Sequence, residues 1–402
     1  MKKKLNKFFN PKSIAVVGAS EKKGKVGFVL IEKLKEFPGK VIPVNIQGSF
    51  IFGNKVYKSV DKIPKRPDLV IIATPNFTVK KILEDCGKRK VRNAIIITAG
   101  FAEVGNFKLQ KEILEISKKY KIKILGPNCF GVSNPHLKLD TTFSNNSAFA
   151  GTTAFISQSG ALWSYLSDYR IGFSGFASLG NMADLEFTDF LKYFNKDKKT
   201  KKIILYVEKL KNGREFIDIC KKSKKEIIVV KSGQSKEGSE VAMSHTASLA
   251  TDYEIYRGAF KQAKVKVAES LAEAVGLKEE NITEKIKAKE VAIITNAGGA
   301  GSLITDKLEN SGIDVGKIVD LLGTAKAKDY ARELNKKIYN GFKQIVVILT
   351  PQRMSEPKKV AGEIIKSKNR KKVVACFLGN RSVKDAVEIL KKARVPVYTH
   401  CC

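Results

Sequence analysis

The chain of 402 residues has little histidine, and it lacks both a long apolar run and a secretory leader. Its only histidines are His136, His245 and His400. Histidine is the one side chain whose unperturbed pKa suits nucleophilic and acid–base chemistry near neutral pH, so this scarcity narrows the search for such a site. No segment approaches the roughly 18 apolar residues of a membrane helix, so no membrane association is expected. The basic start MKKKLNKFF meets no apolar core, which makes a cytoplasmic location the default.

Cysteine spacing in the chain lacks the order of a disulfide framework or a zinc knuckle. No pair forms C-x-x-C, so we expect reduced thiols and no metal site. The run His400-Cys401-Cys402 has metal-ligating side chains, but it stands at the end of the sequence, where a frayed terminus is the stronger expectation. The six cysteines are Cys86, Cys129, Cys220, Cys376, Cys401 and Cys402.

Acidic residues are few compared with basic ones. Lys+Arg number 74 against 40 for Asp+Glu, a formal net charge of +34, which raises the possibility of nucleic-acid or membrane binding. The lysines are scattered along predicted helix faces, as in residues 198–202 and 221–225, without interleaved stacking aromatics. We therefore expect solvated helix faces and no nucleic-acid partner. A polyanionic small ligand or an acidic partner protein better explains any functional share of the charge.

Three segments repeat one pattern, in which a β-branched apolar run leads through a small-residue turn into a helical pattern. Such runs predict buried parallel strands that feed helix N-termini, the usual phosphate or cofactor site of α/β sheets. Their spacing predicts an α/β protein of three domains, at residues 1–150, 151–280 and 289–402, with a Lys- and Glu-rich linker at 276–288. The three segments are residues 13–20, 152–161 and 291–301.

Strand-end turns rich in small residues recur along the first predicted domain. Alternation of strands with helices at 79–88 and 109–120 predicts a doubly wound sheet whose turns line up at the carboxyl edge, where ligands bind. No strict G-x-G-x-x-G is present, and residues 18–25 do not fit a Walker loop, so an NAD or P-loop site is not expected. Further strands are predicted at 40–44, 69–73, 94–98, 122–125, 203–207, 227–230, 291–295, 345–349, 373–377 and 395–398.

Residues 231–250, KSGQSKEGSEVAMSHTASLA, follow the predicted strand at 227–230. They surround His245 with small and hydroxyl-bearing residues, which allow backbone N–H groups to approach a phosphate closely. On this stretch alone, an exposed loop histidine in a polar turn explains the pattern equally well.

Taken together, the motifs resemble those of the α subunit of NDP-forming acyl-CoA synthetases. That family contains the ADP-forming acetyl-CoA synthetases and is related to the succinyl-CoA synthetase α subunit. The resemblance covers essentially the whole chain and implies a Rossmann-like CoA-binding domain followed by two flavodoxin-like doubly wound domains. The motifs are VVGAS at 16–20, GPNCFG at 126–131, SQSGAL at 157–162, SLGN at 178–181 followed by Asp184, and KSG…SHTASLA at 231–250.

The resemblance also implies roles for individual residues. His245 matches the histidine that is transiently phosphorylated, and Glu208 matches the carboxylate that orients it. Phosphate is expected to bind at Ser157, Ser159, Gly160, Gly180, Asn181, Ser244 and Thr246. Coenzyme A is expected to bind at Gly18, Ala19, Ser20, Lys25, Val26, Asn45, Thr74, Pro75, Gly100, Asn128 and Cys129.

The implied reaction converts acyl-CoA, phosphate and ADP to acid, CoA and ATP through an acyl phosphate and a phosphohistidine. Nothing in the sequence resembles an ATP-grasp fold, so Mg-ADP or Mg-ATP is expected on an ATP-grasp β subunit, in a heterotetramer. The alternatives are a non-catalytic CoA- or acyl-CoA-binding regulatory protein, an NAD-type dehydrogenase and a basic nucleic-acid-associated protein. Acetate, a branched-chain acid, an aryl acid and succinate all remain possible as the acid.

The chain departs from the family pattern at a few positions. Ile46 and Lys209 stand where the family usually shows Pro and Gly, and Ala300 replaces a usual Pro. The segment at 313–319 looks shortened, and Cys402 comes where a further helix normally follows. These differences bear on the packing and partner contacts of the third domain.

Overall fold

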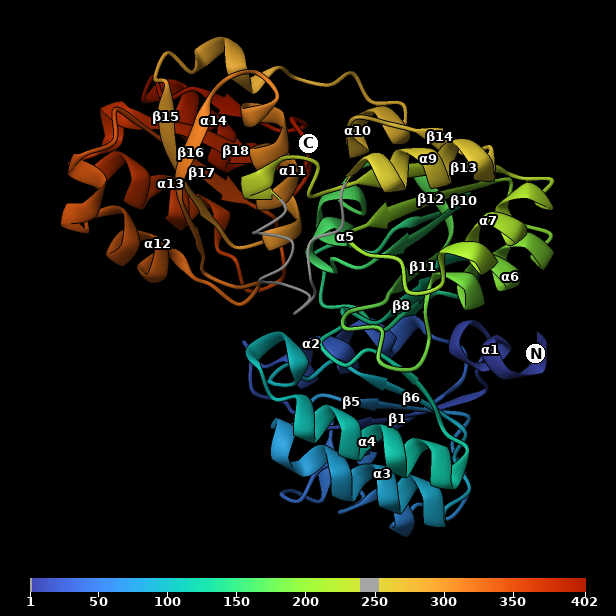
Figure 1. Ribbon diagram of the computed structural model, residues 1–402. Helices are drawn as coiled ribbons and strands as arrows, with labels where there is room; N and C mark the ends of the chain where they lie inside the picture. The colour runs from blue at the N-terminus through green and yellow to red at the C-terminus, as the bar shows by residue number, and fades with distance from the viewer. Residues whose placement is uncertain (1, 239–252) are drawn as a thin grey trace.

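The computed structural model describes residues 2–238 and 253–402. Three sheets, each built mainly of parallel strands, follow one another along the chain and define a first, a second and a third unit (Figure 1). This confirms the predicted α/β class with parallel sheets. Ser244, His245 and Thr246 lie outside the described residues.

The first unit is a five-stranded parallel sheet with strand order β2-β1-β5-β6-β7. Its Val- and Ile-rich strands are buried on both faces, as expected for a sheet covered by helices on each side. Helices α3 (Val79–Lys88) and α4 (Phe107–Tyr120) pack on one face, and α2 (Val26–Lys33) packs on the other. The strands are β1 (Ser13–Val17), β2 (Lys40–Val44), β5 (Leu69–Ile72), β6 (Asn93–Ile96) and β7 (Lys123–Leu125), and a small hairpin is formed by β3 (Phe50–Ile51) and β4 (Asn54–Lys55).

The second unit is a seven-stranded sheet with order β14-β13-β12-β10-β11-β8-β9. Its edge strands β8 (Val132–Asn134) and β9 (Leu139–Asp140) are antiparallel and come from the chain before residue 150. The parallel strands are β10 (Phe149–Ser157), β11 (Gly172–Ser178), β12 (Lys202–Val207), β13 (Glu226–Lys231) and β14 (Lys266–Val267). The helices are α5 (Ala161–Leu166), α6 (Phe187–Lys196), α7 (Gly213–Lys221), α9 (Tyr253–Ala263) and α10 (Leu271–Ala274).

The N-terminal helix α1 (Lys2–Phe9) packs against the second unit, although it precedes the first sheet (Figure 1). The ring of Phe9 stacks on Tyr193 of α6 at 4.6 Å and meets Phe194 edge-on at 5.1 Å. Aromatic pairs of this kind contribute about 0.5–1.5 kcal/mol beyond the area that they bury. Helix α1 therefore ties the first unit to the second.

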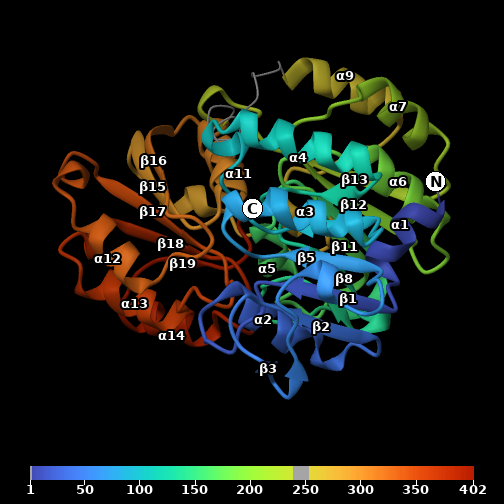
Figure 2. The ribbon, with the colours of Figure 1, turned by 90° about the horizontal axis from the view of Figure 1, so that it is seen from below.

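The third unit is a five-stranded parallel sheet with order β16-β15-β17-β18-β19. Helix α11 (Gly298–Glu309) lies on the face toward the second unit, and α12 (Ala327–Leu334), α13 (Pro357–Lys366) and α14 (Lys384–Lys392) cover the opposite face (Figures 1 and 2). The strands are β15 (Glu290–Thr295), β16 (Asp314–Asp320), β17 (Gln344–Leu349), β18 (Val373–Phe377) and β19 (Val397–Tyr398).

The C-terminal residues pack into the core, so the expectation of a frayed terminus was wrong. Cys401 and Cys402 are buried, with exposed fractions of 0% and 2%, and the carbonyl of Cys402 accepts a hydrogen bond from the N–H of Ala272. The Cys401 and Cys376 sulfurs lie 3.1 Å apart. Apolar contact with the core between the second and third units holds this end of the chain in place.

The segment at 276–288 joins the second unit to the third, but it is more than the polar linker that its composition predicts. Its apolar side chains Ile282, Ile286 and Ala288 are buried in the core between these units. The Glu280 carboxylate accepts a hydrogen bond from the Thr399 N–H at 2.5 Å, which fastens the segment to the C-terminal residues.

Candidate active site

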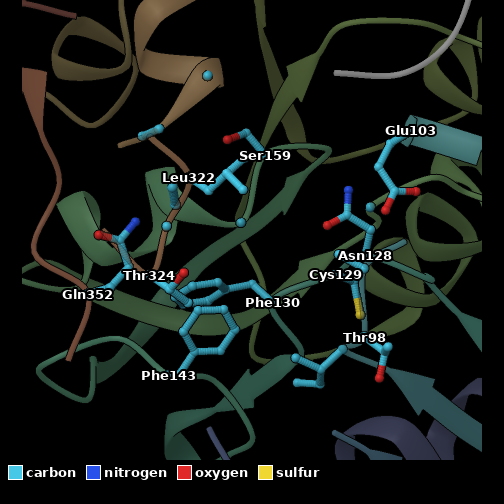
Figure 3. A pocket seen from close by; sticks show the side chains of 18 of the residues that line it. Thr98, Glu103, Asn128, Cys129, Phe130, Phe143, Ser159, Leu322, Thr324 and Gln352 are labelled. Carbon is cyan, nitrogen blue, oxygen red and sulfur yellow. The ribbon is translucent and has the colours of Figure 1, made fainter. Parts of the chain in front are cut away.

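One cavity of about 560 Å³ lies where the three units meet, at the carboxyl ends of their strands. It brings together many of the predicted residues, from turns that are far apart in the sequence (Figure 3). The predicted residues that line it are Val26, Thr74, Asn128, Cys129, Ser159, Gly160, Gly180, Asn181 and Glu208. Additional lining residues come from the third unit, among them Asn296, Gly298, Asp320, Leu322, Thr324 and Gln352.

Gly18 and Ala19 follow β1 and Asn45 follows the neighbouring strand β2, in two adjacent turns outside the cavity lining. Gly18 has φ +91°, and a Cβ there would lie 2.5 Å from the carbonyl oxygen of Ala73, so glycine is required. The Asn45 side chain donates to the Ala19 carbonyl at 2.7 Å. Lys25 precedes α2 and makes no side-chain cap on it. The Phe28 N–H donates to the Lys25 carbonyl at 3.1 Å, which leaves the N–H groups of Val26 and Gly27 for an anionic ligand such as a CoA phosphate.

Two further predicted CoA turns follow β5 and β6. The hydroxyl of Thr74 lies 2.7 Å from that of Thr78, and the Thr78 hydroxyl also contacts the Pro75 carbonyl at 2.6 Å. The Gly100 N–H donates to the Glu103 carboxylate at 2.5 Å. The Gly100 N–H is thus satisfied within its own turn, and Ser20 likewise accepts from a local N–H at 3.0 Å.

Asn128 and Cys129 follow a cis Gly126–Pro127 peptide after β7. The Asn128 N–H donates to the Thr98 carbonyl at 2.9 Å, which holds this turn beside the end of β6. Burial raises the pKa of the Cys129 thiol to about 12, and its sulfur lies 3.3 Å from the Ile96 carbonyl. A thiol in this state is protonated at neutral pH, so Cys129 is not a ready nucleophile.

The predicted phosphate turn lies across the cavity from Cys129. The Ser157 hydroxyl donates to the Ser159 carbonyl at 2.6 Å and shapes the turn that enters α5. A Cβ on Gly160 would lie 2.3 Å from the Cβ of Phe130, so only glycine permits this approach. Phe130 in turn lies 3.8 Å from Phe143, ring centre to ring centre, and this pair forms an apolar wall of the cavity (Figure 3).

Glu208 sits at the end of β12 with an exposed fraction of 8%. The side chain of Gln158 accepts hydrogen bonds from the N–H groups of Glu208 and Lys209 at 2.7 and 2.8 Å. Gln158 therefore fixes the backbone from which the Glu208 carboxylate projects. Burial raises the pKa of neighbouring Tyr206 well above its usual range, and the Glu208 carboxylate adds to this shift.

Lys231 is a buried residue whose amine interacts with the Glu208 carboxylate. Burial lowers the pKa of its amine to about 8, against the opposing pull of the Asp306 and Glu208 carboxylates. Its ammonium lies 4.6 Å from the centre of the Tyr256 ring. Lys231 thus supplies positive charge close to Glu208, at the start of the stretch that leads to His245.

Gly180 and Asn181 join the second unit to the first. A Cβ on Gly180 would lie 2.3 Å from the Pro127 carbonyl oxygen, and the Asn181 side chain donates to Glu103 at 2.5 Å and to Gln110 at 2.9 Å. These contacts hold the turn after β11 against the Cys129 turn.

Among residues 2–238 and 253–402, no cluster of three or more His, Cys, Asp or Glu side chains has the arrangement of a metal site. Over the same residues, no helix combines the length and apolar character that crossing a bilayer requires.

Comparisons with known proteins agree with this geometry. Family models match residues 12–135 as a CoA binding domain and residues 150–279 as a succinyl-CoA ligase like flavodoxin domain. The alpha subunit of acetate–CoA ligase [ADP-forming] II from Pyrococcus furiosus is 38% identical, over 98% of this chain and 94% of that protein. The chain belongs to the family of ADP-forming acyl-CoA synthetase alpha subunits.

Solved members of this family share the fold. The dinucleotide forming acetyl-coenzyme A synthetase 1 of Ca. Korarchaeum cryptofilum, solved with phosphate and ADP, matches with a TM-score of 0.66 at 32% identity. The alignment covers 100% of this chain and 94% of that one. An acetate–CoA ligase [ADP-forming] of Methanocaldococcus jannaschii is 46% identical over 74% of this chain, which is only 43% of that longer protein. Family membership supports the catalytic interpretation over the regulatory one.

Several lining residues were not predicted from the sequence. Gln158 lies within the SQSGAL motif and Gln352 follows an apolar strand, so the sequence contains a signal for both. Glu103, Phe143 and Asp320 carried none, because they come from connecting segments without a recognisable motif.

Proposed function

We propose that this chain is the CoA- and phosphate-handling subunit of an ADP-forming acyl-CoA synthetase that converts acyl-CoA, phosphate and ADP to acid, CoA and ATP. The observation that carries the proposal is a single cavity joining the Asn128–Cys129 turn of the CoA-binding unit to Ser159, Gly160 and Glu208 of the second unit. A thioester held at the first turn and a phosphate held at the second would then share one cavity, which is the proximity that a reaction between them requires.

The first step occurs between these two turns. A phosphate oxygen attacks the thioester carbonyl carbon, the C–S bond breaks, and CoA leaves as a thiolate that takes up a proton. Backbone N–H groups at the Ser159–Gly160 turn are the donors available to the phosphate oxygens. Because the Cys129 thiol stays protonated and buried, the acyl group passes to phosphate without a covalent enzyme thioester.

The second step moves the phosphoryl group to His245. One ring nitrogen attacks phosphorus, the P–O bond to the acyl group breaks, and the free acid leaves. The attacking nitrogen must be unprotonated, so the other ring nitrogen should donate a hydrogen bond. The proposed acceptor is Glu208, whose backbone is held by Gln158.

The acyl group proposed for this site is small and carries no second charge. No Lys or Arg lines the cavity among the described residues, and residues 239–252 contain neither. The charged side chains that line it are the carboxylates Glu103, Glu208 and Asp320. The carboxylate of a succinyl group would be desolvated there with no cation in the lining, since the Lys231 amine behind the lining already interacts with the Asp306 and Glu208 carboxylates. An apolar acyl group instead meets the Phe130–Phe143 wall.

The nucleotide step is assigned to a partner subunit of the ATP-grasp class that carries Mg-ADP, in a heterotetramer. Two relatives support this division. The chain matches nearly the full length of a relative named as a subunit alpha, but less than half of a relative named without a subunit. The charge of +34 favours a partner whose facing surface is acidic.

The phosphohistidine is tested by labelling. The chain and its partner are incubated with Mg-ATP labelled in the γ-phosphate, and we expect acid-labile, base-stable label on the wild type and none on His245→Ala. Glu208→Gln should fold normally and take up label about 10- to 10⁴-fold more slowly, the range for loss of an orienting or acid–base carboxylate. Label that persists in His245→Ala would remove this histidine from the reaction, and an unlabelled wild type would restore the regulatory alternative.

A further inference from the structure

Side chains of helix α11 form hydrogen bonds with the chain just before residue 239. Asp306, in its last turn, has an exposed fraction of 4% and accepts four hydrogen bonds from residues 233–235. The donors are the N–H groups of Gly233 at 2.7 Å, Gln234 at 2.9 Å and Ser235 at 2.8 Å, and the Ser235 hydroxyl at 2.9 Å.

A second contact lies one turn earlier in the helix. The Ser302 hydroxyl donates to the Gly238 carbonyl at 3.0 Å, and the Gly238 N–H donates to the Ser235 hydroxyl, also at 3.0 Å. A Cβ on Gly238 would lie 2.0 Å from the Asp306 carboxylate, so the backbone approaches this carboxylate as closely as glycine allows. Residues 233–238 are thus folded around two side chains of α11.

The other end of α11 reaches the active-site cavity. Gly298 lines the cavity, and the Gly299 carbonyl accepts a hydrogen bond from Tyr206 at 3.2 Å. A Cβ on Gly299 would lie 2.5 Å from the Ser159 hydroxyl oxygen. The 12 residues of α11 therefore connect the phosphate turn with residues 233–238 through one rigid element of about 18 Å.

We propose that Asp306 and Ser302 are positioning residues, which anchor residues 233–238 to α11 and so fix the point from which the chain continues toward His245. The inference rests on the proposed function, because the anchor affects catalysis only if His245 takes part in the reaction. A carboxylate that accepts several backbone N–H groups is a strong and directional anchor. Gly238 precedes His245 by only seven positions in the sequence, so the proposal expects a shift at the anchor to lower kcat.

The test compares Asp306→Asn with Thr305→Val. Asparagine keeps the size of the aspartate but turns an NH₂ toward backbone N–H groups, so at least one of them loses its acceptor. Thr305 is the neighbouring buried residue on α11, and its hydroxyl bonds to the Gly301 carbonyl within the helix. Thr305→Val therefore perturbs the same helix without touching the anchor.

Amide hydrogen exchange of the chain with its partner subunit should show residues 233–238 exchanging at least about tenfold faster in Asp306→Asn. The kcat with acetyl-CoA should fall about 10- to 100-fold, the scale of a displaced catalytic group, while the KM for acetyl-CoA stays within about twofold. Thr305→Val should match the wild type in the exchange rate of residues 233–238, in kcat and in KM. If Asp306→Asn does not fold, Ser302→Ala removes one anchor bond and should give the same changes at smaller size.

Wild-type exchange and wild-type kcat in a folded Asp306→Asn variant would overturn the anchor. Faster exchange with an unchanged kcat would overturn its role in positioning. These outcomes are distinct from failure of the proposed function, because that failure appears as an unlabelled His245 in the wild type, whatever Asp306 does.

Discussion

At the scale of single residues, Glu309 and Glu237 form a carboxyl pair beside the anchored segment. Burial raises the pKa of Glu309 to about 7, and its hydrogen bond with Glu237 adds to the shift. The same bond lowers the pKa of Glu237, and Lys236 lowers it further. Asp314 also faces Glu309 and raises its pKa. The Glu309 carboxyl therefore keeps its proton up to about pH 7 and loses it as the pH rises further.

This pair predicts a pH-dependent stability. The folded-state pKa of Glu309 is raised above its ordinary 4.5. The protonated Glu309 therefore makes its full contribution to the free energy of unfolding below about pH 4.5, and this contribution is lost as the pH rises through about 7. Glu309→Gln keeps a donor toward Glu237 at every pH. We expect the variant and the wild type to unfold at similar denaturant concentrations at pH 5, and the variant to be more stable at pH 8. An equal difference at both values would show that the Glu309 proton does not matter.

The residues that could be predicted from the sequence are those held in motifs at strand ends. Cys129, Ser159 and Glu208 follow apolar strands, and parallel strands bring their carboxyl ends to one edge, so their meeting follows from the pattern. The wall formed by Phe130 and Phe143 could not be predicted, because it depends on how a loop of the second unit folds back across the cavity.

At the scale of elements, most of the long buried strands were predicted to within a residue or two, because both of their faces are apolar. Strand β11 was not predicted, since glycine and serine interrupt its apolar residues, and β10 begins three residues before its predicted start. The short strands β8, β9 and β14 were not predicted either, since two or three residues carry no readable period. Strand β16 was not predicted. Gly316 and Lys317 interrupt its apolar pattern, and its pairing with β15 contains a register shift.

The first turn of α11 predicts an effect on activity. In Gly299→Ala, the new methyl group would meet the Ser159 side chain at 2.5 Å and the Tyr206 hydroxyl at 3.1 Å. We expect a loss of about 1–3 kcal/mol in the free energy of unfolding and a fall in kcat of about tenfold, as overpacking moves the phosphate turn. Denaturant unfolding and steady-state kinetics measure the two effects.

Gly362→Ala is the matched control, because Gly362 lies in α13 and a Cβ there would meet nothing within 4 Å. Alanine should stabilise that helix by up to about 1 kcal/mol and leave kcat unchanged. If both alanine variants behave alike, close contact between α11 and the phosphate turn is not what governs activity.

At the scale of the whole molecule, three units enclose one cavity, and the charge around the cavity differs from the charge of the chain. The net charge is +34, yet the described charged residues that line the cavity are acidic. The basic composition alone favoured a positively charged binding site for a polyanion. In the structure, the positive charge lies outside the cavity lining, mainly on solvated lysines of helices. Only the folded arrangement could separate these two regions.

This separation predicts a preference among acyl groups. With the partner present, kcat/KM for acetyl-CoA should exceed that for succinyl-CoA by on the order of 100-fold or more, because a second carboxylate would be buried against a described lining that has no Lys or Arg. A panel of acyl-CoA thioesters of equal length, with and without a terminal carboxylate, isolates the effect of charge. Equal rates within such a pair would show that the cavity or the partner neutralises the second charge.

The central claim is that this chain performs the CoA and phosphate half of the reaction and needs a partner for the nucleotide half. The most direct measurement is ATP formation from acetyl-CoA, ADP, Mg²⁺ and phosphate, made with the chain alone, with the chain and its partner, and with His245→Ala and the partner. The account predicts ATP only from the wild-type chain together with its partner. ATP made by the chain alone, or by the His245→Ala complex at the wild-type rate, would contradict it.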